Sequence, residues 1–325
     1  MSTLYLDRRD LRLELSGQTL ALYADDHREG TVPVHLLERI VMRSNVHIGS
    51  SALARLADQG VSIAAFGGRM GEKLAIIHGH SHNDGARRIG QYRRYDDLQW
   101  QQRWAYRLVL LKLRRQRRLL SAALSERADQ RHALLTAVNA IEALITRLRV
   151  EPAMSPARLR GIEGAAAAAY FRGFTALFAA SLDFTGRNRR PPRDPVNAVL
   201  SLGYTLLHAE AVRACYGAGL DPIIGYYHRL QFGRESLASD LIEPLRPTID
   251  HFAWEQFRAQ ALRAEDFACE GGACLLSKSA RGSFFSAFEP VITKVRQILR
   301  RATRRLARDF AVVGARGVSS VSEPM

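Results

Sequence analysis

Alternating apolar and polar residues dominate the first part of the chain. The segment LRLELSGQTLALYAD, residues 11–25, alternates on both sides of Ser16-Gly17, which predicts two antiparallel strands joined by a tight turn. SSALARLADQG then predicts one helix that ends at Gly60, and the apolar run VSIAAFG predicts a buried strand directly after it. With a last strand expected in EKLAIIHGH, residues 1–85 are predicted to form a small N-terminal β domain with one helix.

Helical periodicity replaces this alternation after about Asp97. The polar and basic residues 86–97 are predicted to be a linker, and LQWQQRWAYRLVLLKLRRQRRLLSAAL places apolar residues at helical spacing beside a dense arginine face. We therefore predict an α+β fold in which residues 98–318 form a larger, all-helical C-terminal domain. Residues 319–325 are expected to be a flexible tail.

Two helices of this domain carry clear start signals. Ser155 precedes Pro156, and Asp194 precedes Pro195. Serine and aspartate are favoured N-caps, and proline is favoured at the first helical position. Both helices are therefore expected to begin at these prolines.

The charge of the chain points to a polyanionic partner. The 325 residues carry a formal net charge of +15, with 47 Lys and Arg against 32 Asp and Glu. This excess suits nucleic acid or an anionic membrane surface. The charged start MSTLYLDRRDLRLEL does not resemble a signal peptide, and the alanine-rich stretch around Arg172 suits a buried helix better than a membrane span. We therefore expect a cytoplasmic protein that binds nucleic acid, with phosphate contacts along the basic run KLRRQRR.

The cysteines exclude two further classes. Cys215, Cys269 and Cys274 are too few for a disulfide framework and indicate a reducing compartment. The pair in CEGGAC resembles half of a zinc site, but no second cysteine pair exists, so zinc is rejected.

Candidate catalytic chemistry begins with carboxylates. Glu163 lies among alanine and glycine in a predicted helix, where a carboxylate is costly unless it is paired or bound to a cation. Asp240 and Glu243 share one face if SLASDLIE is helical, and His228 precedes them. Oxygen ligands and one imidazole suit Mg²⁺ or Mn²⁺. Taken alone, the stretch from Tyr226 onwards favours a surface loop and a solvated helix face over a metal site.

Four motifs in order change that interpretation: RGIEGAAAAAYF, NRRPPRDPVNAVLSLGYTLL, GLDPIIGYYH and GRESLASDLIEPLRP. Together they resemble the CRISPR-associated integrase of spacer acquisition, a metal-dependent endonuclease, over essentially the whole chain. The resemblance implies that Glu163, His228 and Glu243 bind the metal, and that Asp240 is a further acidic residue of the catalytic site. Many members have less polar residues where this chain has Tyr226 and Tyr227.

The resemblance also implies an activity and partners. It predicts phosphoryl transfer that inserts captured foreign DNA fragments as new spacers into a CRISPR array, with Mg²⁺ or Mn²⁺ as cofactor. The expected partners are double-stranded DNA, a second copy of the chain bound through the β domain, and a small ferredoxin-like adaptation protein. Candidate DNA contacts are Arg114, Arg115, Arg229, Arg234, Arg246 and Lys278. A structure-selective repair nuclease and a non-catalytic basic DNA-binding scaffold are the alternatives.

One histidine cluster is set aside. His78, His80 and His82 alternate in IHGHSH and could line one face of a strand as metal ligands. A solvated loop explains them better, because Asp84 is the only carboxylate close in sequence.

Overall fold

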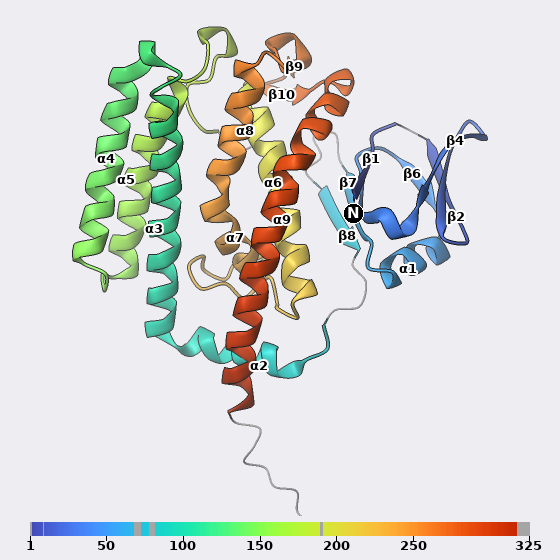
Figure 1. The fold of residues 1–325 in the computed structure, drawn as a ribbon, viewed down its shortest axis with the longest axis horizontal. Coiled ribbons are helices and arrows are strands. Elements are labelled where there is room, and N and C mark those ends of the chain that lie inside the picture. Colours follow the sequence, from blue (N-terminus) through green and yellow to red (C-terminus); the bar gives the residue numbers. More distant parts are fainter. Residues whose placement is uncertain (1, 9, 68–72, 78–81, 189–190, 317–325) are drawn as a thin grey trace, which may run out of the picture. The chain divides into compact units, whose positions relative to one another are not determined.

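The chain divides into two compact units. The computed structural model describes residues 2–8, 10–67, 73–77, 82–188 and 191–316. The units are Met1–Asn83 and Asp84–Met325, drawn from blue to red in Figure 1. The first unit is mainly strands and the second mainly helices, which confirms the predicted α+β class.

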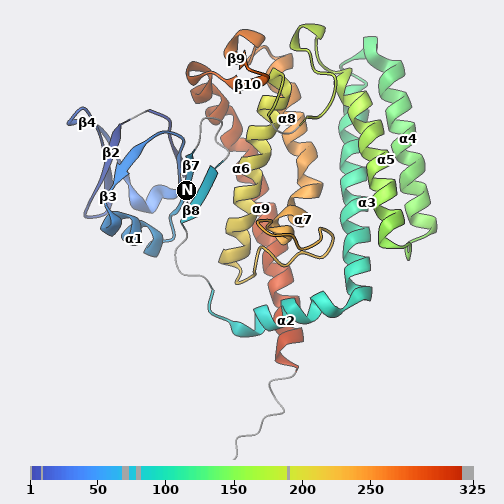
Figure 2. The ribbon, with the colours of Figure 1, turned by 180° about the vertical axis from the view of Figure 1, so that it is seen from behind.

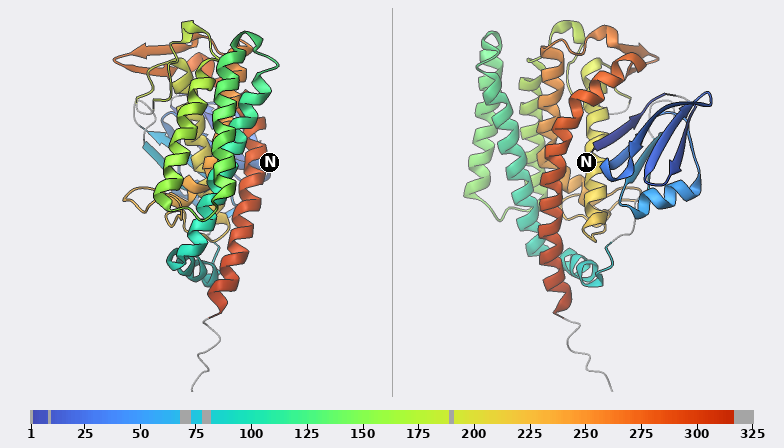
Figure 3. Two further views of the ribbon diagram at one scale, coloured as in Figure 1. Left: turned by 90° about the vertical axis from the view of Figure 1, so that its left-hand side faces the viewer. Right: turned by 45° about the vertical axis from the view of Figure 1, so that its right-hand side comes forward.

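The first unit contains two four-stranded sheets. One has the order β4-β3-β2-β6 and the other β1-β5-β7-β8. The predicted hairpin is confirmed, because β2 and β3 pair antiparallel with Ser16 opposite Thr19. Leu20, Ile40, Leu56 and Ile63 are fully buried in a common core, so α1 packs its apolar face on the strands (Figure 3). The elements are β1 (Ser2–Leu6), β2 (Leu11–Ser16), β3 (Thr19–Ala24), β4 (His27–Pro33), β5 (Leu37–Met42), β6 (Val46–Ile48), α1 (Ser50–Asp58), β7 (Ser62–Gly67) and β8 (Lys73–Ile77).

The second unit is built from long helices packed side by side. In Figures 1 and 2, α3, α4 and α5 form one group, and α6, α8 and α9 lie next to them. Both predicted starts are confirmed: Ser155 Oγ accepts from Arg158 N at 3.3 Å, and Asp194 Oδ1 accepts from Asn197 N at 2.8 Å. The elements are α2 (Gly85–Asp96), α3 (Leu98–Ala123), α4 (Arg131–Val150), α5 (Pro156–Thr175), α6 (Pro195–Gly217), α7 (Ser236–Ile242), α8 (Arg246–Arg258), β9 (Phe267–Glu270), β10 (Ala273–Leu276) and α9 (Lys278–Ala315).

The predicted linker 86–97 is wrong. These residues form α2, which begins with Asp84 as N-cap and packs along α9. The contact is backbone against backbone, since a Cβ on Gly90 would lie 1.8 Å from the carbonyl oxygen of Phe310. Glycine makes this close crossing possible. The helix therefore buries a face that carries no large apolar side chains.

The C-terminal domain is not entirely helical. The strands β9 and β10 form a short antiparallel hairpin, in which Cys269 and Cys274 face each other and form a disulfide. Gly271 and Gly272 make the turn with positive φ, as a two-residue hairpin requires. The predicted tail 319–325 lies outside the described residues, as do two of the set-aside histidines, His78 and His80. No helix in the described part of the chain is long and apolar enough to cross a membrane.

Candidate active site

Three separate elements bring Glu163, Lys112 and Glu243 together. Glu163 lies within α5, Lys112 lies on the buried side of α3, and Glu243 begins a short 3-10 turn, Glu243–Leu245, directly after α7. Small residues allow the close approach of α5 to its neighbours, since a Cβ on Gly173 would lie 2.7 Å from Ala137 Cβ on α4. Ala166 and Ala169 are buried on the same helix, so small side chains form part of its packed face.

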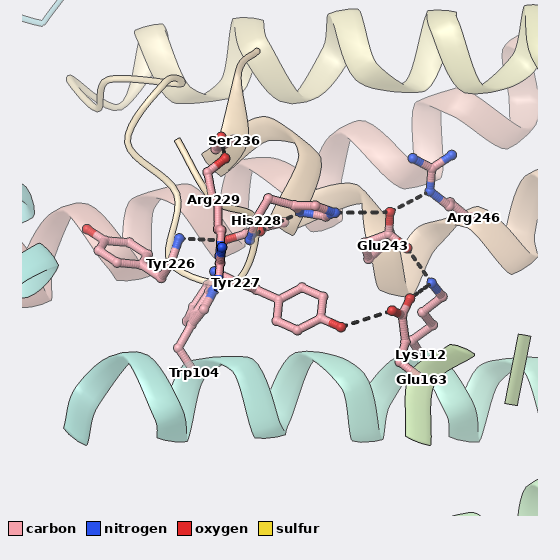
Figure 4. Close-up of polar contacts among 11 residues, drawn as sticks. Trp104, Lys112, Glu163, Tyr226, Tyr227, His228, Arg229, Ser236, Glu243 and Arg246 are labelled. Atoms are coloured by element: carbon pink, nitrogen blue, oxygen red, sulfur yellow. Dashed lines mark hydrogen bonds and ion pairs between the residues drawn. The ribbon is translucent and has the colours of Figure 1, made fainter. Parts of the chain in front are cut away.

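The ammonium group of Lys112 lies between the two glutamates. Its Nζ donates to Glu163 Oε1 and, at 2.6 Å, to Glu243 Oε2 (Figure 4). The side chains of Lys112 and Glu243 are only 10% and 7% exposed, so both charges are desolvated. Burial opposes the charged form of Lys112, but Glu243 and Glu163 outweigh it and raise the pKa of the ammonium group. Burial also opposes ionisation of Glu243, yet Lys112 and Arg246 lower the pKa of this carboxyl to about 2.

His228 is oriented by Asp240. Its Nδ1 lies 2.7 Å from Asp240 Oδ1, and its Nε2 lies 4.0 Å from Glu243 Oε1. Asp240 is fully buried and also accepts from the backbone N–H groups of Tyr226, Tyr227 and His228 at 2.8–2.9 Å. Both carboxylate oxygens of Asp240 are engaged in this way. The contacts therefore favour a role in positioning His228 and not a role as a metal ligand.

Two further side chains complete the cluster. The Tyr227 hydroxyl donates to Glu163 Oε2 at 2.9 Å, and Arg246 Nε donates to Glu243 Oε1 at 2.8 Å. Burial, followed by the charge of Glu163, raises the pKa of Tyr227, so this phenol stays a donor. Each glutamate is therefore held by Lys112 on one oxygen and by a second donor on the other (Figure 4).

A further buried carboxylate, Asp250, lies near Arg246. Asp250 accepts hydrogen bonds from the hydroxyls of Tyr170, at 2.7 Å, and Tyr204. The guanidinium of Arg246 lies 4.6 Å from the centre of the Tyr204 ring, within the range of a cation–π contact. Burial raises the pKa of Asp250 to about 6, against the hydrogen bonds of the two phenols. This group supports the Arg246 side of the site.

The helix α2 holds the loop that carries His228. Gln91 is fully buried, and its side-chain amide donates to the carbonyl of Asp221 at 2.7 Å and accepts from the Asp221 N–H at 2.8 Å. The Tyr226 hydroxyl donates a hydrogen bond to the backbone carbonyl of Gln91 at 3.0 Å. The segment predicted to be a linker is therefore part of the framework of the site.

Glu163 and Glu243 meet at Lys112, and His228 Nε2 lies 4.0 Å from Glu243 Oε1 (Figure 4). The part of the chain that the structure describes nevertheless contains no group of three or more His, Cys, Asp or Glu arranged to hold a metal ion. The ammonium of Lys112 lies between the two carboxylates and donates to one oxygen of each. The donor set itself fits Mg²⁺ or Mn²⁺, because it offers two carboxylates and an imidazole whose far nitrogen is held by an aspartate. An ion bound to Glu163 Oε1 and Glu243 Oε2 would displace Lys112 from these oxygens.

The six candidate DNA contacts fall into two groups. Two of them have structural partners: Arg115 donates to the Pro244 carbonyl at 3.1 Å, and Arg246 pairs with Glu243. The others lie at least partly at the surface. These are Arg114 on α3, Arg229 and Arg234 in the loop after His228, and Lys278 at the start of α9.

Sequence reasoning missed Lys112. The run KLRRQRR seemed to have no acidic partner, yet Lys112 pairs with Glu163 and Glu243, and Arg117 pairs with Glu142. A signal was present, because Lys112 continues the helical stripe of the buried residues Leu108, Val109, Leu113, Gln116 and Leu120. A lysine at such a position needs buried anions. Tyr227 was noted as unusually polar, but no pattern linked it to Glu163.

Comparisons with known proteins place the chain among the CRISPR-associated proteins of the adaptation module. The family model described as CRISPR associated protein Cas1 matches residues 4–290. The chain is 37% identical over 316 residues to CRISPR-associated endonuclease Cas1 1 of Thermodesulfovibrio yellowstonii, covering 95% of this chain and 96% of the relative. This protein therefore belongs to the Cas1 family, which confirms the resemblance.

Solved structures share the fold at low sequence identity. A Cas1 protein from Thermotoga maritima superposes with a TM-score of 0.82 at 20% identity over the whole of both chains. A casposase bound to integration product gives a TM-score of 0.79 at 19% identity, covering 96% of this chain and 91% of that one. A chain of a Cas6-RT-Cas1–Cas2 complex gives 0.78 at 22% identity, covering 95% of this chain and 35% of that one.

Proposed function

We propose that this protein is a divalent-metal-dependent DNA endonuclease and integrase that inserts captured DNA fragments into a CRISPR array. One observation carries the proposal: Glu163 and Glu243 both contact the ammonium of Lys112, and His228 Nε2 lies 4.0 Å from Glu243 Oε1. Two carboxylates and an imidazole around a common point are a ligand set for a hard divalent ion. The naming of the 37% identical relative as an endonuclease supports the same activity.

The residues of the chain have distinct roles in this proposal. Glu163, Glu243 and His228 Nε2 would hold the ion. A bound ion supplies a Lewis acid that neutralises charge on the phosphoryl oxygens and lowers the pKa of the attacking hydroxyl. Asp240 fixes the ring of His228, and Arg246 keeps Glu243 oriented. The same cluster could serve a water molecule or a DNA 3′-OH as nucleophile.

The DNA is expected to approach along the loop that follows His228. Arg229 is exposed and Arg234 half-buried there, and a turn at Gln231–Arg234 joins them. Exposed arginines also line α3 and α9, in keeping with the net charge of +15. Basic surfaces of this kind bind the phosphate backbone without reading sequence. The casposase of the same fold is bound to an integration product, which supports DNA as the substrate.

We expect two protein partners. A second copy of the chain would bind through the unit Met1–Asn83, and light scattering should then give the mass of a dimer at micromolar concentration. A small ferredoxin-like adaptation protein would complete the assembly, which the Cas1–Cas2 complex containing a chain of this fold supports. A monodisperse monomer would contradict the dimer.

An integration assay tests the proposed reaction. Labelled duplex fragments are incubated with the protein, its adaptation partner, Mn²⁺ and a supercoiled plasmid that carries the repeat. Joining of the fragment to the plasmid is expected with 3′-OH ends and not with dideoxy 3′ ends, because the 3′-OH is the nucleophile. If the plasmid is nicked equally with both kinds of end and no fragment is joined, the protein is a nuclease and the proposed integrase activity is wrong.

A further inference from the structure

The pairing of Lys112 with two expected metal ligands calls for an explanation. Lys112 lies on the core side of α3, and its side chain is 10% exposed. Its Nζ contacts one oxygen of Glu163 and one of Glu243. An ion at the usual carboxylate–metal distance of about 2.0–2.6 Å from both oxygens would occupy nearly the same place as this ammonium.

Charge balance explains why the site is complete without an ion. A buried carboxylate, Glu243, close to a partly buried one, Glu163, is strongly unfavourable unless cations compensate the two charges. Lys112 and Arg246 supply two positive charges to the two negative charges of Glu163 and Glu243. The charges of these four side chains therefore cancel, which offsets the repulsion between the two carboxylates.

The two cations differ in where they sit. Arg246 binds Glu243 Oε1, on the side that faces His228 Nε2, and its guanidinium is also stacked on Tyr204. Lys112 contacts both Glu163 and Glu243 and so joins them, whereas Arg246 contacts Glu243 (Figure 4). Its flexible four-carbon stem allows it to withdraw, whereas the stacked guanidinium is fixed.

We propose that Lys112 is a built-in cation that occupies the metal position in the metal-free protein and competes with the divalent ion for Glu163 and Glu243. Lys112 thereby holds the site in shape before the ion arrives and lowers the affinity for it. The inference rests on the proposed metal-dependent function, and it adds a residue that controls when the site becomes loaded. It assigns Lys112 a role distinct from the surface arginines of the same helix.

Direct metal binding tests the inference. The full-length wild type is compared with Lys112→Met and Lys112→Gln. Calorimetry measures the affinity for Mn²⁺, and electron paramagnetic resonance measures the concentration of free Mn²⁺. Both variants remove the competing charge, so Mn²⁺ is expected to bind about tenfold more tightly or better. The glutamine variant keeps a neutral donor for one carboxylate and serves if the methionine variant does not fold.

Arg246→Gln is the matched control for general electrostatics. It also removes one positive charge beside Glu243, but not the cation that lies between the two carboxylates. A gain in Mn²⁺ affinity that is restricted to the Lys112 variants supports competition. A second supporting result is that metal-free Lys112→Met melts at a lower temperature than the wild type and that added Mn²⁺ raises this temperature again. An equal gain in Arg246→Gln, or no gain in either Lys112 variant, would overturn it.

The outcomes also separate this inference from the proposed function. If the wild type binds Mn²⁺ and the Lys112 variants bind it no more tightly, the role of Lys112 is wrong and the metal site stands. If neither the wild type nor any variant binds Mn²⁺, both are wrong.

Discussion

Nδ1 of His228 lies 2.7 Å from Oδ1 of Asp240, and this contact fixes which ring nitrogen faces the site. A neutral His228 that donates from Nδ1 presents the lone pair of Nε2 towards Glu243. The same aspartate accepts hydrogen bonds from three successive backbone N–H groups of the loop. One carboxylate therefore sets both the loop path and the orientation of the His228 ring.

Asp240→Asn is expected to damage the site although it is nearly isosteric. Both carboxylate oxygens accept backbone N–H groups, so the amide NH₂ of asparagine must face a donor. We expect a fall in metal-dependent cleavage of about 10–100-fold and a loss of stability of about 1–3 kcal/mol, measured by a nuclease assay and urea unfolding. The control is Asp221→Asn, which changes an aspartate of the same loop that does not contact His228. Cleavage at the wild-type rate by Asp240→Asn would show that Asp240 does not orient His228.

Tyr227→Phe should affect the site rather than the fold. It removes only the hydroxyl that donates to Glu163 Oε2 at 2.9 Å. We expect cleavage at limiting Mn²⁺ to fall by about tenfold, since hydrogen bonds to charged groups contribute roughly 1.5–3 kcal/mol. Tyr226→Phe deletes a hydroxyl bound to the Gln91 carbonyl instead. It should lower stability and leave the Mn²⁺ dependence unchanged. If both variants show the same Mn²⁺ dependence, Tyr227 has no special role at Glu163.

Asp250 should make stability depend on pH. Burial raises the pKa of Asp250 from 3.8 to about 6 in the folded protein. The folded state therefore binds the proton more tightly, and the free energy of unfolding falls as pH rises from about 4 to above 6. Asp250→Asn lacks this contribution. The free energy of unfolding of the wild type minus that of Asp250→Asn should decrease by about 2 kcal/mol between pH 4.5 and pH 8.

Urea unfolding of both proteins at pH 4.5 and pH 8 provides the comparison. Groups other than Asp250 titrate in both proteins and cancel in the difference. A difference that does not change with pH would mean that Asp250 titrates normally in the fold.

DNA affinity should fall steeply with salt. Binding that neutralises phosphates releases condensed counterions, and each contact contributes about 0.9 to the slope of log affinity against log salt. Arg114→Gln on α3 and Arg304→Gln on α9 remove exposed charges and should each lower the slope by about one. Arg28→Gln, an exposed arginine of β4, is the matched control. An affinity that hardly varies with ionic strength would contradict phosphate-dominated binding.

The sequence predicted the elements whose signals are local. Periodicity located the β2–β3 hairpin and the long helices, and the pairs Ser155-Pro156 and Asp194-Pro195 gave two helix starts. The helix α2 was missed because its buried face is made of Gly90 and Gln91, which carry no apolar periodicity. The Gly271-Gly272 turn of the β9–β10 hairpin was a usable signal that was not used.

The site was predicted through resemblance and not through local pattern. Glu163, His228 and Glu243 lie far apart in the sequence, and only the packing of α3, α5 and α7 with the loop after α6 brings them together. Lys112 was hidden because a lysine inside a basic run looks like a surface charge. Its partners come from two other elements, so only the fold reveals the pairing.

The central claim is that Glu163 serves the chemistry while other surfaces bind the DNA. Its most direct test measures cleavage and DNA binding together for the wild type and Glu163→Ala. Glu142→Ala, which removes a glutamate paired with Arg117 on α3, serves as the control. The account predicts that Glu163→Ala loses Mn²⁺-dependent cleavage and binds the DNA with nearly wild-type affinity, while Glu142→Ala keeps both. Full cleavage by Glu163→Ala would contradict the account.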